Sequence, residues 1–153
     1  MFVKSHTEVA VEFGALRDRL LRCPADYLDA AADDARRHGS QLLVEAGLDV
    51  PAPDTDRTER RTRIEVGQPV STDRVMSLPL RFLTGERGRR FPNMDGSLDA
   101  AWLGPDCTQL SVTAQYEPPQ DVLDRIAERA LLHRLVEAVA QRFVESAARR
   151  LMA

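Results

Sequence analysis

The chain has 153 residues, of which 43% are hydrophobic and 29% charged, and its formal net charge is −3 at pH 7. This composition predicts one globular domain over residues 1–153, large enough to bury a core without metal or disulfide cross-links. Nucleic-acid binding is not expected, because phosphate contacts require a strongly basic surface. The sequence contains neither a bilayer-spanning apolar run nor an apolar secretory segment, so we expect a cytoplasmic protein without stable membrane insertion.

The first third of the chain predicts a strand followed by two short helices. Hydrophobic and polar residues alternate from Phe2 to Phe13, which indicates a half-buried strand, and Gly14 is expected to end it. The first helix should contain Leu16 to Leu21. The second should begin at Pro24, a residue that suits the first turn of a helix, and end at Gly39.

The middle of the chain predicts antiparallel strands joined by turns. Residues 41–45 fit either a helical turn or a strand, and the polar, proline-containing stretch 49–58 is expected to be a surface loop. Alternation predicts four strands, at Arg61–Val66, Val75–Leu83, Ser97–Trp102 and Thr108–Tyr116. Pro79 lacks an amide hydrogen for the sheet and should lie at an edge or a bulge. Residues 85–88 form a candidate hairpin turn.

One long amphipathic helix is predicted from about Asp121 to Met152. The Asp121 carboxylate can accept hydrogen bonds from the free amide groups at the start of this helix. Residues at spacings of three and four form an apolar stripe along it: Leu132, Val136, Val139, Phe143 and Ala147. Strands grouped between helical segments indicate an α+β domain.

Several short motifs occur around the last strand and this helix. Tyr116 closes the strand and is followed by Pro118 and Pro119, Phe91-Pro92 precedes an acidic turn, and His133-Arg134 begins the main body of the helix. With these motifs, residues 91–151 resemble the START-like superfamily, the Bet v 1-like or SRPBCC helix-grip domains. Within it, the chain most resembles an actinobacterial branch.

The resemblance implies a curved antiparallel sheet of about seven strands around the long C-terminal helix, with two short helices after the first strand. The superfamily includes polyketide cyclases, plant lipid-binding allergens and lipid-transfer proteins. Its members bind lipids, sterols, polyketides or hormones, and a minority catalyse reactions. We therefore expect a small hydrophobic ligand or lipid in a cavity between the sheet and the helix, and no cofactor.

The expected cavity lining comes from the inward positions of the strands and the apolar stripe of the helix. Eleven residues are predicted to line it: Met76, Leu78, Leu80, Phe82, Trp102, Leu110, Val112, Tyr116, Val136, Val139 and Phe143. Trp102 and Tyr116 could each offer a ring and one polar group to a ligand. Ordinary core packing of the same residues is the alternative.

His133 and Tyr116 are weak candidates for catalysis. An imidazole can act as an acid or base near neutral pH, but His133 could equally bond a backbone carbonyl or face water. No Gly-x-Ser-x-Gly motif, phosphate-binding loop or metal-ligand spacing occurs in the sequence. Cys23 and Cys107 lack metal or redox spacing; two reduced thiols are favoured, and a disulfide between them stays open.

Three functions remain open. Binding of an apolar ligand without catalysis is favoured. A cyclase- or aromatase-like enzyme would use His133, Tyr116 or an arginine for proton transfer, and it requires at least two titratable groups inside the cavity. A protein-interaction domain would have a filled core. A homodimer is compatible with all three.

Overall fold

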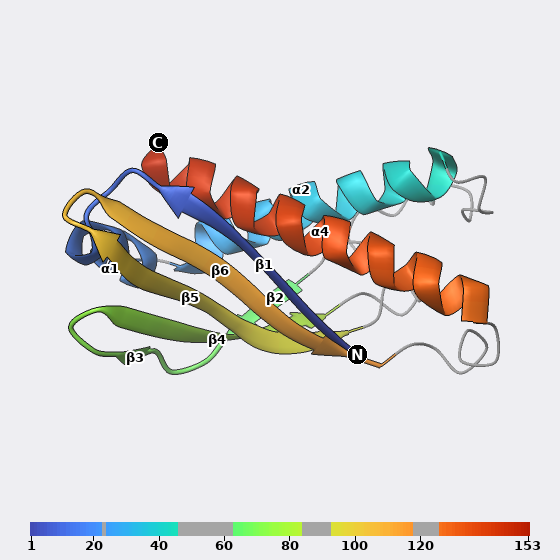
Figure 1. The fold of residues 1–153 in the computed structure, drawn as a ribbon, viewed down its shortest axis with the longest axis horizontal. Coiled ribbons are helices and arrows are strands. Elements are labelled where there is room, and N and C mark those ends of the chain that lie inside the picture. Colours follow the sequence, from blue (N-terminus) through green and yellow to red (C-terminus); the bar gives the residue numbers. More distant parts are fainter. Residues whose placement is uncertain (23, 46–62, 84–92, 118–125) are drawn as a thin grey trace.

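The computed structural model describes residues 1–22, 24–45, 63–83, 93–117 and 126–153. The helices, numbered as in Figure 1, are α1 (Phe13–Leu21), α2 (Pro24–Glu45) and α4 (Ile126–Met152). The strands are β1 (Phe2–Val9), β2 (Arg63–Val66), β3 (Val70–Ser71), β4 (Val75–Leu83), β5 (Met94–Gly104) and β6 (Cys107–Tyr116).

The six strands of the described residues form one antiparallel sheet. Its order is β1-β6-β5-β4-β2, and β3 also pairs with β4. The first strand therefore lies beside the last one, with Phe2 opposite Gln115 and Val9 opposite Thr108. The α-amino group of Met1 donates to the carbonyl of Tyr116 at 2.6 Å, which extends this pairing to the end of β6.

Helices α2 and α4 lie side by side on one face of the sheet (Figure 1). Helix α4 packs against β1 and β6, helix α2 packs against α4 and β2, and α1 contacts β5 and β6. This arrangement confirms the α+β helix-grip fold predicted from the sequence. None of the helices in the described ranges is long and apolar enough to cross a membrane.

The core lies between the sheet and the two long helices. Alternate residues of the central strands point into it, and Leu78, Leu98 and Leu110 are at most 1% exposed. The five residues of the predicted stripe on α4 are all buried as well. Burying one large aliphatic side chain contributes about 1.5–3 kcal/mol relative to leaving it in water, so this layer dominates the stability of the fold.

Strand β1 ends at Val9, four residues earlier than predicted. The chain turns there, because the amide of Val11 donates to the carbonyl of Val9 at 2.9 Å. The hydroxyl of Thr108 then donates to the carbonyl of Val11 at 2.8 Å, which takes that carbonyl out of the sheet ladder. Phe13 consequently begins α1, and Gly14 lies inside this helix instead of ending a strand.

The second helix is longer than predicted. It contains 22 residues and continues through the buried Gly39 to Glu45, so residues 41–45 are helical. A glycine inside a helix costs about 1 kcal/mol relative to alanine. Packing of α2 against α4 and β2 offsets this cost, because tertiary burial outweighs local propensity.

Pro79 lies inside β4, opposite Ser97 of β5, and not at a sheet edge. Its carbonyl accepts a hydrogen bond from the amide of Gly67 at 2.8 Å, where the outer neighbour of β4 changes from β2 to β3. In an antiparallel strand the N and C=O of one residue face the same side. The position without an N–H therefore faces the gap between β2 and β3, where no continuous ladder of hydrogen bonds is interrupted.

Other predictions differ in extent or fall outside the described residues. Strand β5 is longer than predicted, and the described residues form six strands, whereas about seven were predicted for the chain. Cys107 is a free thiol. The predicted loop at 49–58, the hairpin turn at 85–88, the helix cap at Asp121 and the residue Cys23 lie outside the described ranges.

Candidate functional site

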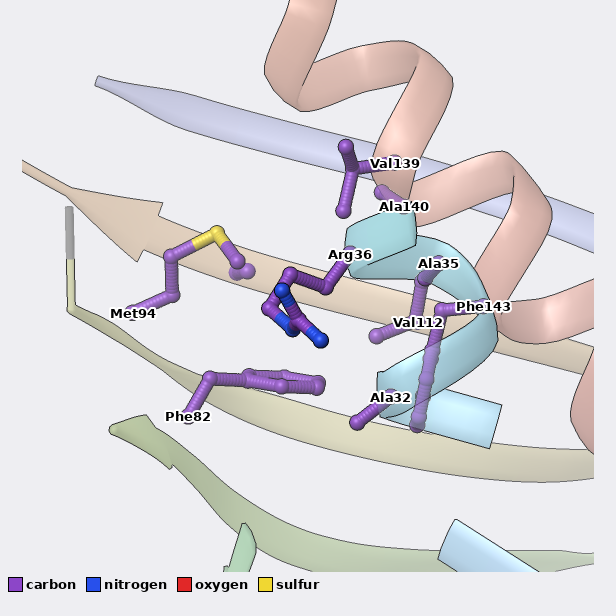
Figure 2. A pocket seen from close by; sticks show the side chains of 10 residues that line it. Ala32, Ala35, Arg36, Phe82, Met94, Val112, Val139, Ala140 and Phe143 are labelled. Carbon is purple, nitrogen blue, oxygen red and sulfur yellow. The ribbon is translucent and has the colours of Figure 1, made fainter. Parts of the chain in front are cut away.

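A cavity of about 40 Å³ lies between the sheet and helices α2 and α4. Figure 2 shows the side chains around it. Ten residues line the cavity: Ala32, Ala35 and Arg36 of α2, Phe82 of β4, Met94 of β5, Val112 and Ala114 of β6, and Val139, Ala140 and Phe143 of α4. Nine of these ten side chains are apolar, and both layers of the fold contribute to the lining.

Small and large side chains together create this space. Ala32 and Ala35 place only methyl groups on the inner face of α2, so the helix lies near the sheet without filling the gap. The rings of Phe82 and Phe143 meet edge to face, with centroids 5.0 Å apart and an interplanar angle of 84°. This preferred aromatic geometry joins β4 to α4 and fixes one wall.

Arg36 is the one polar side chain among the ten lining residues. Its guanidinium group lies in the middle of the lining, between Met94, Phe82 and Val139 (Figure 2). Its Nε atom is buried and has no hydrogen-bond partner. Within the described ranges, no carboxylate forms an ion pair with Arg36. A buried donor without an acceptor costs about 1–3 kcal/mol, so this position opposes stability.

The free space is much smaller than a typical ligand. Pockets for small molecules measure about 300–1,000 Å³, whereas one water molecule needs only about 10–15 Å³. At about 40 Å³, the cavity holds a ligand only if some lining side chains move. Arg36 and Met94 are the two long unbranched side chains in the lining, so they can move with the least disturbance of the surrounding core.

The structure brings four of the eleven predicted lining residues to the cavity: Phe82, Val112, Val139 and Phe143. Six others are buried in the surrounding core and do not line it: Met76, Leu78, Leu80, Leu110, Tyr116 and Val136. Trp102 is 40% exposed, and the guanidinium carbon of Arg74 lies 4.7 Å from the centroid of its ring. Trp102 pairs with Thr108 near the end of β5, and its ring lies at the surface and not in the cavity.

The sequence interpretation missed the contribution of α2. Ala32, Ala35 and Arg36 were not among the predicted lining residues, because the expected cavity was bounded only by the sheet and the C-terminal helix. A signal was present, since Arg36 comes four residues after Ala32 and so shares the apolar face of α2. An arginine on an otherwise apolar helix face marks a position where burial and charge conflict.

Tyr116 and His133 form a polar bridge between β6 and α4. The Tyr116 hydroxyl lies 2.9 Å from Nδ1 of His133, and Nε2 of His133 lies 3.0 Å from Oε1 of Glu137. The carboxylate can only accept, so Nε2 carries the proton, and in the neutral ring Nδ1 accepts from the tyrosine. The partner Glu137 follows His133 by four residues, a helical spacing that the sequence interpretation did not use.

This bridge holds Tyr116 as a neutral phenol. Burial, and then the charge of Glu137, raise the pKa of Tyr116 above its ordinary value of 10.0. The ring is 2% exposed, and its hydroxyl already has His133 as a partner. Because neither Tyr116 nor His133 lines the cavity, the bridge joins the sheet to α4 beyond the cavity and offers no free acid or base inside it.

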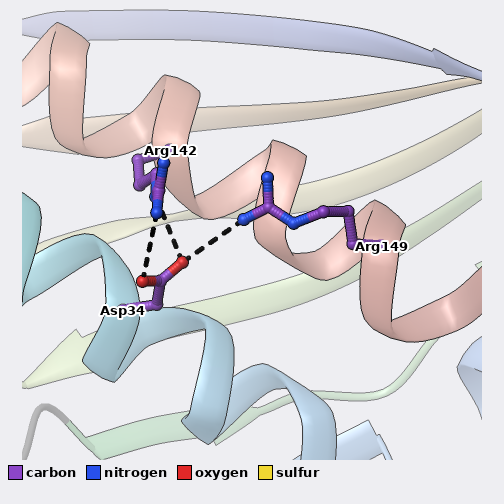
Figure 3. Close-up of polar contacts among 3 residues, drawn as sticks. All are labelled: Asp34, Arg142 and Arg149. Carbon is purple, nitrogen blue, oxygen red and sulfur yellow. Dashed lines mark hydrogen bonds and ion pairs between the residues drawn. The ribbon is translucent and has the colours of Figure 1, made fainter. Parts of the chain in front are cut away.

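A second polar cluster joins the two long helices. Figure 3 shows Asp34 of α2 between Arg142 and Arg149 of α4. Arg142 Nε lies 3.1 Å from Oδ2 of Asp34, and Arg149 Nη2 lies 3.5 Å from the same oxygen. Partial burial raises the pKa of Asp34, but hydrogen bonds from Arg142 and Ser146 and the two positive charges outweigh it, so the net pKa is below 3.8. The cluster fixes α2 against α4 beside the cavity.

Across the described residues, no group of three or more His, Cys, Asp or Glu side chains is arranged to hold a metal ion. Arg36 is the one polar residue among the ten that line the cavity, whereas Tyr116, His133 and Asp34 are engaged in bridges between elements.

No protein-family model and no curated protein sequence matches the chain. Among solved structures, a conserved protein from Geobacillus kaustophilus has a TM-score of 0.54 and 13% identity, covering 99% of this chain and 95% of that one. A protein from Thermus thermophilus has a TM-score of 0.52 and 12% identity, with coverages of 99% and 97%. An aromatase/cyclase from a Streptomyces species has a TM-score of 0.45 and 12% identity, with coverages of 99% and 93%.

At these identities, the likeness concerns the fold alone. The likeness supports the α+β fold that the sequence resemblance implied, an antiparallel sheet with a long C-terminal helix packed against it. The actinobacterial branch stays a prediction.

Proposed function

We propose that the protein binds a small hydrophobic molecule or a lipid in the cavity between the sheet, α2 and α4. The observation that carries this proposal is the lining, in which nine apolar side chains from five elements surround one space. Each Å² of apolar ligand surface removed from water contributes roughly 25 cal/mol, before the costs of association are subtracted. Shape and apolar contact would then supply most of the affinity.

The ligand would enter as the side chains of Arg36 and Met94 move aside within the lining. The void of about 40 Å³ is the space that these two flexible side chains leave unfilled. The Phe82–Phe143 pair and the Asp34 cluster would keep the walls in place during this exchange, because both connect α4 to other elements. The site is thus partly formed before the ligand arrives, which lowers the cost of ordering it.

The lining favours binding over catalysis. A cyclase- or aromatase-like reaction would require at least two titratable groups that reach the ligand, and Arg36 is the single titratable group among the described lining residues. Tyr116 and His133 bond to each other instead.

Methyl NMR during titration with 1-octanol tests this proposal with residue resolution. We expect shifts at the methyl groups of Val112, Val139, Ala140 and Met94, which line the cavity. Leu16 and Leu20 serve as internal controls, since both are fully buried but do not line it.

Two results of this titration would contradict the proposal. Shifts confined to the exposed Val70, Val75 and Leu103 would place the probe on the surface. An absence of saturable shifts at the lining methyl groups would favour the interaction domain with a filled core.

A further inference from the structure

The cation of Arg36 lacks a counter-charge in the part of the chain that the structure describes. Asp34 is two residues away in sequence, but its carboxylate is bound by Arg142 and Arg149. Asp33 comes one turn before Arg36, yet no ion pair joins them, and Oδ1 of Asp33 is itself buried without a hydrogen-bond partner. Among the described residues, the partly buried guanidinium of Arg36 therefore has no ion-pair partner, and it lies among apolar side chains (Figure 2).

This arrangement is unfavourable for the protein alone. A charge held partly among apolar side chains loses some of its hydration without gaining a partner, and replacing it with an apolar group can stabilise a fold. Local features that oppose stability concentrate at functional sites, where another molecule completes them. The described part of the chain offers Arg36 no acceptor with a negative charge.

We propose that the ligand is an apolar molecule with one carboxylate group, and that this carboxylate pairs with the guanidinium of Arg36. The inference rests on the proposed function, since it places the ligand in the same cavity. A planar guanidinium matches a carboxylate in two parallel hydrogen bonds, and its buried Nε is one of the donors that this geometry uses.

Charge balance selects a carboxylate over a phosphate. Arg36 supplies one positive charge, and the other nine lining side chains supply none. A carboxylate carries one negative charge near pH 7, whereas a phosphate monoester carries about 1.5 to 2. A phosphate would leave excess negative charge in an apolar cavity, where desolvation makes it costly. The apolar tail of the ligand would contact Phe82, Phe143 and Val139.

The test compares four probes with the same eight-carbon tail: octanoate, 1-octanol, octylamine and octyl phosphate. Isothermal titration calorimetry gives the Kd of each for the wild type and for Arg36→Met. The matched control is Arg37→Met, because Arg37 is the adjacent arginine on α2 but is exposed and does not line the cavity. Thermal denaturation of each variant confirms that it is folded.

We expect octanoate to bind the wild type about tenfold or more tightly than 1-octanol, since a hydrogen bond to a charged group contributes more than one to a neutral group. Octylamine should bind more weakly than 1-octanol. In Arg36→Met the preference for octanoate should disappear while 1-octanol still binds, and Arg37→Met should keep the preference.

Other outcomes separate the two proposals. Equal binding of octanoate and 1-octanol to the wild type, or an unchanged preference in Arg36→Met, overturns the carboxylate inference but leaves the hydrophobic site intact. Tighter binding of octyl phosphate than of octanoate also overturns it and identifies a phosphate ligand. If neither octanoate nor 1-octanol binds, the proposed function fails together with this inference.

Discussion

The cavity is a packing defect that a single methylene group can reduce. Val112 lies on β6 with its side chain against the cavity, and Val112→Ile keeps the β-branched shape that suits a strand. Cavities destabilise proteins by about 24 cal/mol per Å³. A void of about 40 Å³ therefore costs about 1 kcal/mol, which is an upper limit for what filling it can return.

One added methylene group is expected to recover most of this amount. A buried methylene contributes about 0.8 kcal/mol, and 1 kcal/mol corresponds to about 2–4 °C in the Tm of a chain of this size. We predict that Val112→Ile raises the free energy of unfolding by about 0.8 kcal/mol and the Tm by about 2–3 °C. Urea titration and thermal denaturation, both followed by circular dichroism, measure these quantities.

Val144→Ile is the matched control. Val144 is fully buried but does not line the cavity, so the same added group has no free space. Overpacking of a filled core typically costs about 1–3 kcal/mol. If Val112→Ile destabilises the protein as much as Val144→Ile does, no usable space exists beside Val112, and the reasoning from the cavity is wrong.

Three further changes have expected outcomes in unfolding experiments. Arg36→Met should raise the free energy of unfolding by about 1 kcal/mol, because it removes a buried donor without a partner. Tyr116→Phe should lower it by about 1 kcal/mol through loss of the bond to His133. Because the folded-state pKa of Tyr116 is raised, its contribution is full below pH 10.0 and is lost as pH rises through the folded-state pKa; the variant should lack this alkaline loss. Asp34→Asn should lower stability at pH 7 by up to about 1 kcal/mol, since its ion pairs are partly exposed. The folded-state pKa of Asp34 lies below 3.8, so the difference from wild type should vanish as pH falls through it.

Opposite results would identify which interaction has been misread. A less stable Arg36→Met would mean that the guanidinium has a stabilising partner in the folded chain. An identical alkaline loss in Tyr116→Phe would assign that loss to other groups. If Asp34→Asn remains less stable than the wild type by the same amount at pH values well below 3.8, ion pairs of the ionised carboxylate do not explain the lowered pKa of Asp34.

The fold could be predicted wherever local pattern and tertiary burial agree. The period-two alternation of Val75–Leu83 and the three-and-four spacing on α4 both correspond to buried faces in the structure. The sequence pattern did not predict the ends of elements where long-range contacts determine the backbone conformation. Gly39 resembles a helix end in isolation, but the packing of α2 against α4 carries the helix six residues further. β1 ends at Val9 because Thr108, far along the chain, binds the next turn.

The candidate site was harder to predict than the fold. The cavity depends on how closely α2 approaches the sheet, which the sequence of neither element specifies alone. An alternation of period two predicts which face of the sheet a side chain occupies, but not whether it lies beside the cavity. Leu78 and Leu110 are therefore core residues, whereas Phe82 and Val112 line the cavity. The place of Arg36 in the lining could not be predicted without knowing that other elements cover its face of α2.

Native mass spectrometry of the protein purified from its own host tests most directly whether the cavity accommodates a guest. We predict a species heavier than the 17.1 kDa chain by the mass of one small organic molecule, released on denaturation. The extra mass should be reduced or lost in a variant that fills the cavity, such as Val112→Ile combined with Val139→Ile. A mass equal to that of the bare chain under gentle conditions, together with no binding of the octyl probes, would mean that the cavity holds no ligand.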